Sequence, residues 1–549
     1  MRRRPRWLRF PGGAALGWIL LGALVLRLWS LKHGLPYVYN TDEEQHFVPK
    51  AVAMIGGSLD PKYFENPPGL TYLLFAVFKL RFHAGFPFGS HGFLHSFRHD
   101  PTAVFETARF VVALLGTLVV GLVYWAGSRF YERRVGLTAA VLMACAFLPV
   151  FYSKQALNDV ATLVPLTVGL VACLFVYQEG RWWQWALAGG AVAVATDVKY
   201  TAGAMAALVA LAGILRLVER RETLGDFVKG AVLAAVVFGV VVIALDPYAL
   251  VHFSLFKHQV AGEAGTASGS AKIGQTNEPG WIYYLWTLGW GLGWLPLIAS
   301  VAGGVLALLS NRARGLLLAA FPILLLIFLG GQARHFGRWY LPAYPALAVL
   351  AAYAAVRAVD ALPAAWSHRR TLLVGVAAGL LAIQGLWSSV RVDSVLAKTD
   401  TRTLARQWLA RNVPPGSKLV VEPAVFPKDW QQVGKPLLSY TLYGIKPPFQ
   451  AYEKKLTPAL IDTYRAGGFC RVLVASYQRD RGLKAGLANA RAYYRRLAAE
   501  SAPPVVFSPY RFGAKPVGFN FDLSFDYLPR AYARPGPLLE LYTLKACPT

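Results

Sequence analysis

Residues 103–127 read AVFETARFVVALLGTLVVGLVYWAG, an apolar run whose charged residues all fall near its start. A run of about 18 or more apolar residues is long enough to cross the hydrocarbon core of a membrane as a helix. Ten further apolar runs, several of them only 15 to 18 residues long and so at the lower limit for a span, lie at roughly 13–31, 135–151, 160–177, 182–197, 200–217, 229–246, 281–308, 315–330, 340–357 and 371–390. The sequence therefore predicts an α-helical polytopic membrane protein with about eleven transmembrane helices.

The composition supports this fold class. Of the 549 residues, 55% are hydrophobic and 15% are charged, whereas a soluble domain carries about 25% charged residues. This balance excludes a single soluble globule and a disordered basic chain. The formal charge of +27 would suggest nucleic acid in a soluble protein. Here we expect no nucleic-acid partner, because much of the surplus lies beside the predicted spans.

Lysine and arginine in the short loops predict the orientation, because such residues stay on the cytoplasmic side. With the N-terminus inside, the inner segments hold 18 of them and the short outer loops hold four. The four are Lys154, Lys199, Arg334 and Arg338. An odd number of spans then places residues 391–549 outside the cell. We expect a multi-pass protein of the inner (plasma) membrane, with a transmembrane domain at 1–390 and an extracytoplasmic domain at 391–549.

Two predicted outer loops are too long to be simple connectors. The loop 32–102 contains an apolar piece, Leu70 to Leu80, which is too short to span and predicts a helix lying at the membrane interface. The loop 247–280 contains AGEAGTASGSAKIGQTNEPG, which is small and polar enough to be mobile. It is a candidate lid over a substrate.

The tail has the composition of a small α/β domain. An amphipathic helix is expected over Asp400–Asn412 and a long Arg-rich helix over 482–499. Short strands are expected at Leu419–Val421, Val472–Ala475 and Leu538–Leu544. Cys470 and Cys547 both lie in this domain, where an oxidising compartment would permit a disulfide.

The chemistry is expected in YNTDEEQHFVPKAVAMIGGSLDPKYFENPPGLTYLL, residues 39–74. A carboxylate of Asp42, Glu43 or Glu44 can accept a proton from a hydroxyl nucleophile if partial burial raises its pKa. A structural alternative is that Thr41 and Glu44 form a helix-capping box. His46 lies four residues after Asp42 and predicts a hydrogen-bonded Asp–His pair, since no third metal ligand is near.

The order of these motifs resembles the GT-C glycosyltransferases, in particular the protein O-mannosyltransferase and aminoarabinose-transferase branch. A first span is followed by Asp42-Glu43, a helix, and the Pro67-Pro68 turn. The later segments that fit are FYSKQALNDVATLVP (151–165), VATDVKYTAG (194–203), ARHFGRWYLPAYPALAVL (333–350) and DTRTLARQWLARNVPPGSKLVV (400–421). The resemblance implies a sugar donor linked to polyprenyl phosphate and an acceptor that is a glycan, a lipid or a protein.

The resemblance also implies roles for single residues. Asp42 would be the catalytic base, Glu43 would support it, and Asp159 would orient the acceptor. Direct attack on the sugar would invert its anomeric centre. The cations available for the donor phosphate are Lys199, Arg334 and Arg338, although such residues also lie near headgroups for structural reasons alone.

Other residues are less constrained by the resemblance. Tyr63 is a candidate for stacking on the sugar, and His46 is a candidate binding residue beside it. Relatives in the aminoarabinose branch carry lysine where this chain has Asn66. Arg109, inside the second span, would either pair with a loop carboxylate or reach the interface. No acidic pair of the oligosaccharyltransferase type is present, so we expect neither a metal nor any other cofactor.

Two other classes of protein remain as alternatives. A transporter or lipid flippase would place charges near the membrane midplane in two related halves, and this sequence shows no such internal symmetry. A non-catalytic envelope scaffold would bind polymer through the tail.

Overall fold

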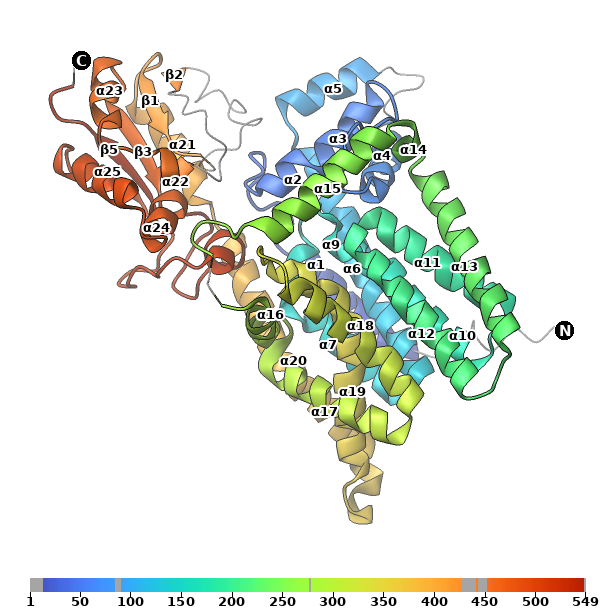
Figure 1. The fold of residues 1–549 in the computed structure, drawn as a ribbon. Helices are drawn as coiled ribbons and strands as arrows, with labels where there is room; N and C mark the ends of the chain where they lie inside the picture. Colours follow the sequence, from blue (N-terminus) through green and yellow to red (C-terminus); the bar gives the residue numbers. More distant parts are fainter. Residues whose placement is uncertain are drawn as a thin grey trace.

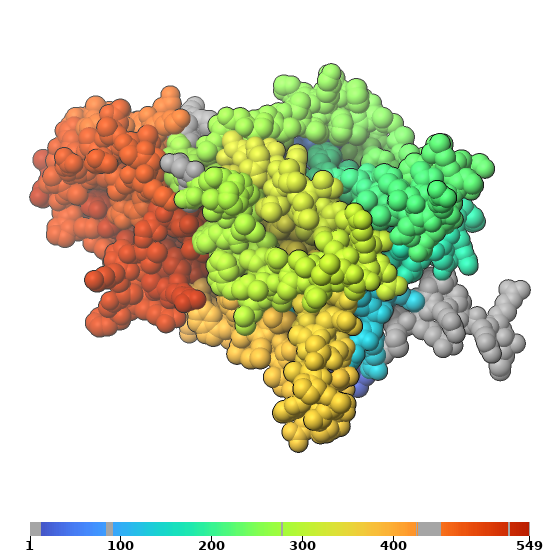
Figure 2. Space-filling model, turned by 60° about the horizontal axis from the view of Figure 1, so that its bottom comes forward, coloured from blue at the N-terminus to red at the C-terminus, as the bar shows by residue number. Residues whose placement is uncertain are grey.

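A computed structural model describes residues 13–83, 90–275, 278–423, 425, 441–442 and 452–547. It consists of a helical bundle and a smaller α/β domain beside one end of the bundle (Figure 1). Figure 2 shows the same two lobes from another side, with the connection between the last two bundle helices projecting away from them.

Each predicted span corresponds to one helix or to consecutive helices. The bundle consists of α1 (Gly13–Leu28), α6 (Thr102–Phe130), α7 (Arg133–Cys145), α8 (Phe147–Tyr152), α9 (Asn158–Ala161), α10 (Leu163–Gln178), α11 (Trp182–Val198), η2 (Tyr200–Met205), α12 (Ala206–Val218), α13 (Leu224–Leu245), α16 (Gly280–Leu288), η3 (Gly289–Gly293), α17 (Trp294–Ser310), α18 (Arg312–Gly330), η4 (Gly337–Ala343), α19 (Tyr344–Asp360), η5 (Ala364–Arg369) and α20 (Arg370–Leu396). Within the described ranges, eight helical segments are long and apolar enough to cross a membrane.

The other three predicted spans are short or broken. The helix α1 has 16 residues and α11 has 17. The third is interrupted at Ala146, whose extended backbone (ψ 128°) separates α7 from α8. The prediction of a helical polytopic membrane protein is therefore confirmed, while the length criterion is met by fewer helices than the eleven predicted.

The helices α10 and α19 lie at the centre of the bundle. The apolar windows of both segments are 89% buried, whereas that of α13 is only 11% buried. The exposed face of α13 is apolar, with Val232, Val236 and Val240 all more than half exposed. An apolar outer surface of this kind is what a lipid environment favours.

Short helices cover the end of the bundle beside the α/β domain (Figure 1). They are α2 (Thr41–Gln45), α3 (Phe47–Ile55), α4 (Gly69–Phe82), α5 (Ser90–His99), α14 (Tyr248–Val251) and α15 (Phe253–Gly269). We call this the loop end; it is the end predicted to be outer. The predicted interfacial piece Leu70–Leu80 is helical within α4. Within the loop 247–280, predicted to be mobile, Tyr248–Val251 and Phe253–Gly269 form the helices α14 and α15 rather than irregular chain.

The C-terminal domain contains a five-stranded sheet in the order β2-β1-β3-β5-β4. Its elements are α21 (Thr401–Asn412), β1 (Lys418–Val421), β2 (Thr441–Leu442), α22 (Tyr452–Lys455), α23 (Leu460–Ala466), β3 (Arg471–Ala475), α24 (Ser476–Lys484), α25 (Ala488–Ala499), β4 (Val505–Phe507), η7 (Leu523–Tyr527) and β5 (Leu539–Thr543). The strands β2, β1 and β3 are parallel, and β5 runs antiparallel to β3 and β4. A disulfide joins Cys470 to Cys547.

The prediction of a single Arg-rich helix over 482–499 is wrong. The chain forms two helices, α24 and α25, because Gly486 between them has a φ of +71°. This left-handed conformation, which glycine adopts readily, ends the first helix.

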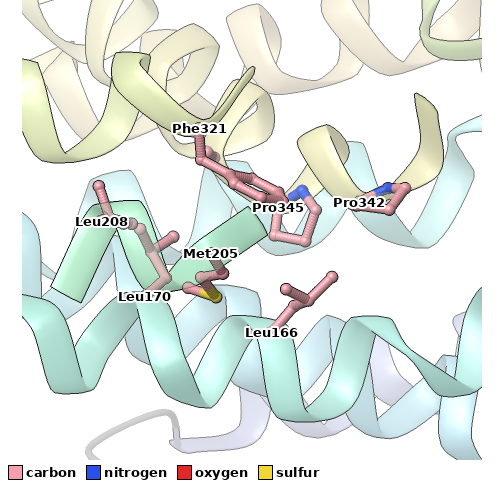
Figure 3. Close-up of a pocket in the computed structure, with 8 residues that line it drawn as sticks. Leu166, Leu170, Met205, Leu208, Phe321, Pro342 and Pro345 are labelled. Atoms are coloured by element: carbon pink, nitrogen blue, oxygen red, sulfur yellow. The ribbon is translucent and has the colours of Figure 1, made fainter. Parts of the chain in front are cut away.

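A small cavity lies inside the bundle among α10, α12, α18 and the start of α19 (Figure 3). Only apolar side chains line it, among them Leu166, Met205, Phe321 and Pro345. Its volume is about 10 Å³, which is barely the room that one water molecule requires. It is a packing defect and is too small to bind a substrate.

Candidate active site

Asp42 stands in the first turn of α2, and Asn40 caps this helix. The Asn40 Oδ1 atom accepts hydrogen bonds from the backbone N–H groups of Asp42 and Glu43. The Asn40 amide also donates to Gln155 Oε1 at 2.8 Å, which ties α2 to the chain before α9. The predicted capping role of Thr41 is therefore wrong, because Asn40 is the N-cap residue.

Four of the predicted site residues meet in one charged cluster. Arg338 Nη2 donates to Asp42 Oδ2 at 2.5 Å, and Arg338 Nε lies 3.7 Å from Asp159 Oδ2. Lys199 Nζ donates to Asp159 Oδ1 at 2.5 Å. These side chains come from α2, α9, the end of α11 and η4, so the fold joins positions 296 residues apart. We call Asp42, Asp159, Lys199 and Arg338 the charged cluster.

One side chain of the charged cluster, that of Asp42, is partly exposed to solvent. The side chain of Asp42 is 38% exposed, whereas those of Asp159, Lys199 and Arg338 are 3%, 12% and 15% exposed. Asp159 is held at the base of the cluster because its neighbour Asn158 donates to Val198 O at 2.8 Å. Asp42 is therefore the member of the cluster that is most accessible to solvent.

The pKa of Asp42 shifts in the direction opposite to the one expected from its sequence. Burial alone would raise this pKa, but Arg338, His46 and Lys272 more than compensate and hold it below its usual value. Asp42 is therefore ionised in the free protein. The expectation of a raised pKa was wrong because the position of Arg338 in space is not visible in the sequence.

His46, Tyr63 and Asn66 form a hydrogen-bonded chain beside Asp42. His46 Nε2 lies 4.0 Å from Asp42 Oδ1, and His46 Nδ1 is 2.6 Å from Tyr63 Oη. The Asn66 amide donates to Tyr63 Oη at 2.7 Å. The Tyr63 ring stacks on His46, and the Lys50 ammonium lies 4.6 Å from its centroid. Stacking of Tyr63 on a sugar stays a prediction, with His46 and Lys50 already in contact with the ring.

Glu43 points away from Asp42 and into the bundle. Its carboxylate receives two hydrogen bonds of 2.7 Å from Arg109, and both side chains are almost completely buried. Arg109 also donates to the carbonyls of Leu31 and His33. Of the two alternatives for Arg109, pairing with a loop carboxylate is confirmed. Glu43 can act on Asp42 only through the position of the loop.

Lys272 is a cation of the site that the sequence reasoning missed. Its ammonium lies 4.4 Å from the ring centroid of Phe336 and 5.3 Å from that of Phe521. Burial lowers its pKa to about 8, while Asp42 opposes the shift. The segment looked like a mobile linker because small residues surround the lysine.

Arg334, predicted among the phosphate-binding cations, contacts the end of α15. Its Nε donates to Ser270 O at 3.1 Å, and its backbone N–H donates to Ala267 O. Among the residues the structure describes, no group of three or more His, Cys, Asp and Glu side chains is arranged to hold a metal ion.

Comparisons with known proteins agree with this architecture. The family described as dolichyl-phosphate-mannose-protein mannosyltransferase matches residues 102–245, which include Asp159 and Lys199. The structure of ArnT from Cupriavidus metallidurans superposes with a TM-score of 0.53 at 16% identity, over 90% of this chain and 97% of that one. The archaeal oligosaccharyltransferase AglB from Archaeoglobus fulgidus superposes with a TM-score of 0.56 at 13% identity, over 92% and 74%. No curated protein matches the sequence.

The fold is therefore the GT-C fold of membrane glycosyltransferases. Residues 102–245 match the protein mannosyltransferase family, and the whole chain has the fold of ArnT and AglB.

Proposed function

We propose that this protein transfers one sugar from a polyprenyl-phosphate donor to an acceptor hydroxyl at the loop end of the bundle. The observation that carries the proposal is the convergence of Asp42, Asp159, Lys199 and Arg338 into one cluster with an exposed carboxylate. The matching family is described by its dolichyl-phosphate-mannose donor, and the AglB structure is a complex with an inhibitory peptide and a dolichol-phosphate. Both support a lipid-phosphate donor for this chain.

In the proposed reaction, the acceptor oxygen forms a bond to the anomeric carbon as the bond from that carbon to the phosphate oxygen breaks. The acceptor proton passes to Asp42, and polyprenyl phosphate leaves with the bonding electron pair. Attack from the face opposite the phosphate inverts the anomeric centre. No cofactor beyond the donor is required.

The cations stabilise the leaving phosphate. Arg338 is the first candidate because its guanidinium is already held between the two carboxylates of the cluster. Lys199 and Lys272 add two further cations near the same point. Stabilisation of this kind is strongest where charge develops in the transition state.

Arg338 also connects donor binding to the strength of the base. In the free protein Arg338 lowers the pKa of Asp42, while burial acts in the opposite direction. When a donor phosphate takes a hydrogen bond from Arg338, the effect of this arginine on Asp42 weakens. The pKa of Asp42 then rises, and the carboxylate becomes a better proton acceptor only when donor is present.

We further place the reaction on the outer face of the plasma membrane, with a cytoplasmic N-terminus and an extracytoplasmic C-terminal domain. The excess of Lys and Arg in the loops of the opposite end supports this orientation. Asp159, which is almost completely buried, orients Lys199 and Arg338 and acts on the acceptor through these two side chains.

The test is sugar transfer by purified protein from a polyprenyl-phosphate donor. Asp42→Asn is expected to lower kcat at least about 100-fold, since general base catalysis contributes about 10²–10⁴. Asp100→Asn is the matched control, because Asp100 is an exposed carboxylate of the same loop whose contact is with Thr102 N. Equal rates for Asp42→Asn and the wild type would eliminate Asp42 as the base. Lipid translocation without any product would instead favour a flippase.

A further inference from the structure

A segment of the C-terminal domain, Phe519–Tyr527, packs against the turn that carries Arg338. The Phe521 ring contacts Phe336 edge to face, with centroids 6.0 Å apart. Tyr527 Oη is 2.8 Å from Tyr152 Oη, and the Tyr527 ring lies 4.6 Å from that of Trp290. The segment therefore contacts several elements of the bundle close to the charged cluster.

Asp522 is the polar centre of this contact. Its Oδ2 accepts a 2.6 Å hydrogen bond from Tyr283 Oη of α16. Its Oδ1 accepts from the backbone N–H of Gly337, at 3.5 Å, directly before Arg338. Asp522 is only 3% exposed. One carboxylate thus joins the C-terminal domain, α16 and the start of η4.

We propose that Asp522 is a positioning residue for Arg338, so that the C-terminal domain completes the active site of the membrane domain. This inference rests on the proposed function, in which Arg338 stabilises the leaving phosphate. Asp522 acts through the backbone of Gly337 and through its negative charge, without touching the substrate.

The placement of Asp522 favours this role over simple adhesion between the domains. Burying a carboxylate costs free energy unless its partners compensate. Apolar residues alone would hold the two domains together without this cost. Burial raises the pKa of Asp522 to about 6, against the opposing effects of Tyr283, Gly337 and Arg338. The Asp522 carboxylate is therefore buried at an energetic cost, beside the turn that carries Arg338.

The turn itself has little freedom. A Cβ atom at Gly337 would lie 2.9 Å from Thr287 Cγ2 and 3.4 Å from Tyr527 Oη. The Arg338 guanidinium lies over the ring of Phe336, 4.8 Å from the ring centroid, and Lys272 lies beside the same ring. Packing thus restricts the turn from both sides, and the hydrogen bond from Gly337 to Asp522 links its backbone to the C-terminal domain.

The experiment compares Asp522→Ala, Asp522→Asn and Tyr283→Phe in the full-length protein. The matched control is Asp462→Ala, which removes an exposed carboxylate of the same domain paired with Arg496. Amide hydrogen exchange over residues 336–343 is measured without any substrate. Values of kcat and KM are then measured with a polyprenyl-phosphate sugar donor.

Asp522→Ala is expected to speed exchange over residues 336–343 at least about tenfold. It is expected to lower kcat about 10- to 100-fold and to change KM less than about threefold, because a misplaced Arg338 weakens the transition state most. Asp522→Asn keeps an acceptor oxygen and should recover much of the loss. Tyr283→Phe should shift both readings in the same direction by less, and the control should shift neither.

Unchanged exchange at 336–343 in Asp522→Ala would overturn the inference. Faster exchange throughout the bundle would overturn it as well, because Asp522 would then act in general docking. If Asp522→Ala fails to fold, Asp522→Asn and Tyr283→Phe decide by the same two readings. A wild-type protein without any transfer would count against the proposed function, while the exchange data would still decide whether Asp522 holds the turn.

Discussion

The buried pair of Glu43 and Arg109 gives the sharpest quantitative prediction. Its side chains are 0% and 1% exposed, and the guanidinium donates to both carboxylate oxygens at 2.7 Å. Glu43 Oε1 also accepts from the backbone N–H of Ala156, close to α9. Glu43→Gln keeps the shape of the side chain and removes its charge.

The cost of this substitution follows from what remains. Arg109 would stay charged and buried, with only neutral acceptors left, namely the new amide oxygen and the carbonyls of Leu31 and His33. Breaking a buried ion pair by removing one partner costs about 3–5 kcal/mol. This corresponds to a loss of about two to four orders of magnitude in the folding equilibrium. In the double variant Glu43→Gln/Arg109→Met no charge is left unpaired, so part of the loss should be recovered.

The assay measures thermal unfolding of the purified protein in one detergent, together with transfer by the fraction that remains folded. Glu43→Gln should lower the Tm clearly, and the double variant should lie between it and the wild type. At a temperature where both are folded, kcat of Glu43→Gln should stay within about threefold of the wild type. A normal Tm combined with a large loss of kcat would refute the argument, because Glu43 would then take part in the chemistry.

Three further outcomes are expected. Burial raises the pKa of the Glu422 carboxyl from 4.5 to about 8, so this group stabilises the fold fully below pH 4.5 and loses that contribution as pH rises through 8. Glu422→Gln should therefore remove up to about 5 kcal/mol of the pH dependence of stability. The measurement compares the Tm at pH 5 and pH 8, and a pH dependence equal to that of the wild type would contradict the prediction. Cys470→Ser opens the disulfide to Cys547 and should destabilise the domain by about 2–5 kcal/mol, read by hydrogen exchange in the sheet; exchange equal to that of the wild type would contradict it. Lys272→Gln should raise the donor KM about tenfold, whereas Lys257→Gln on the exposed face of α15 should not; equal KM values would remove Lys272 from the site.

The helices were predictable because membrane burial leaves a strong signal in a single sequence. Each apolar run became helix, since a segment in lipid must satisfy its backbone hydrogen bonds within itself. The exact limits were less predictable: Ala146 separates α7 from α8 although the run 135–151 is continuous in composition. The strands β1, β3 and β5 were predictable from their apolar residues, whereas β2 and β4 have only two and three residues.

The site was predictable where its residues lie in recognisable motifs and unpredictable where it depends on position in space. Asp42, Asp159 and Arg338 stand in segments that resemble a known family, and they meet. Lys272 comes from a segment whose composition indicates only a linker. Asp522 belongs to another domain, and its role depends on which backbone N–H group it reaches.

The charges of the site match the charges of the proposed reaction. Lys199, Lys272 and Arg338 are three cations against the two carboxylates of Asp42 and Asp159, which leaves a formal excess of one positive charge. A polyprenyl-phosphate sugar is a phosphodiester with one negative charge, and the polyprenyl phosphate that leaves carries close to two at neutral pH. Proton transfer to Asp42 raises the positive excess of the site from one to two in the same step. The site therefore remains neutral toward the phosphate before and after the sugar moves, provided that Asp42 is the group that accepts the proton. A base elsewhere would leave an unbalanced negative charge in a half-buried site at the moment of transfer, so with a lipid-phosphate donor the charge balance favours Asp42 as the proposed base.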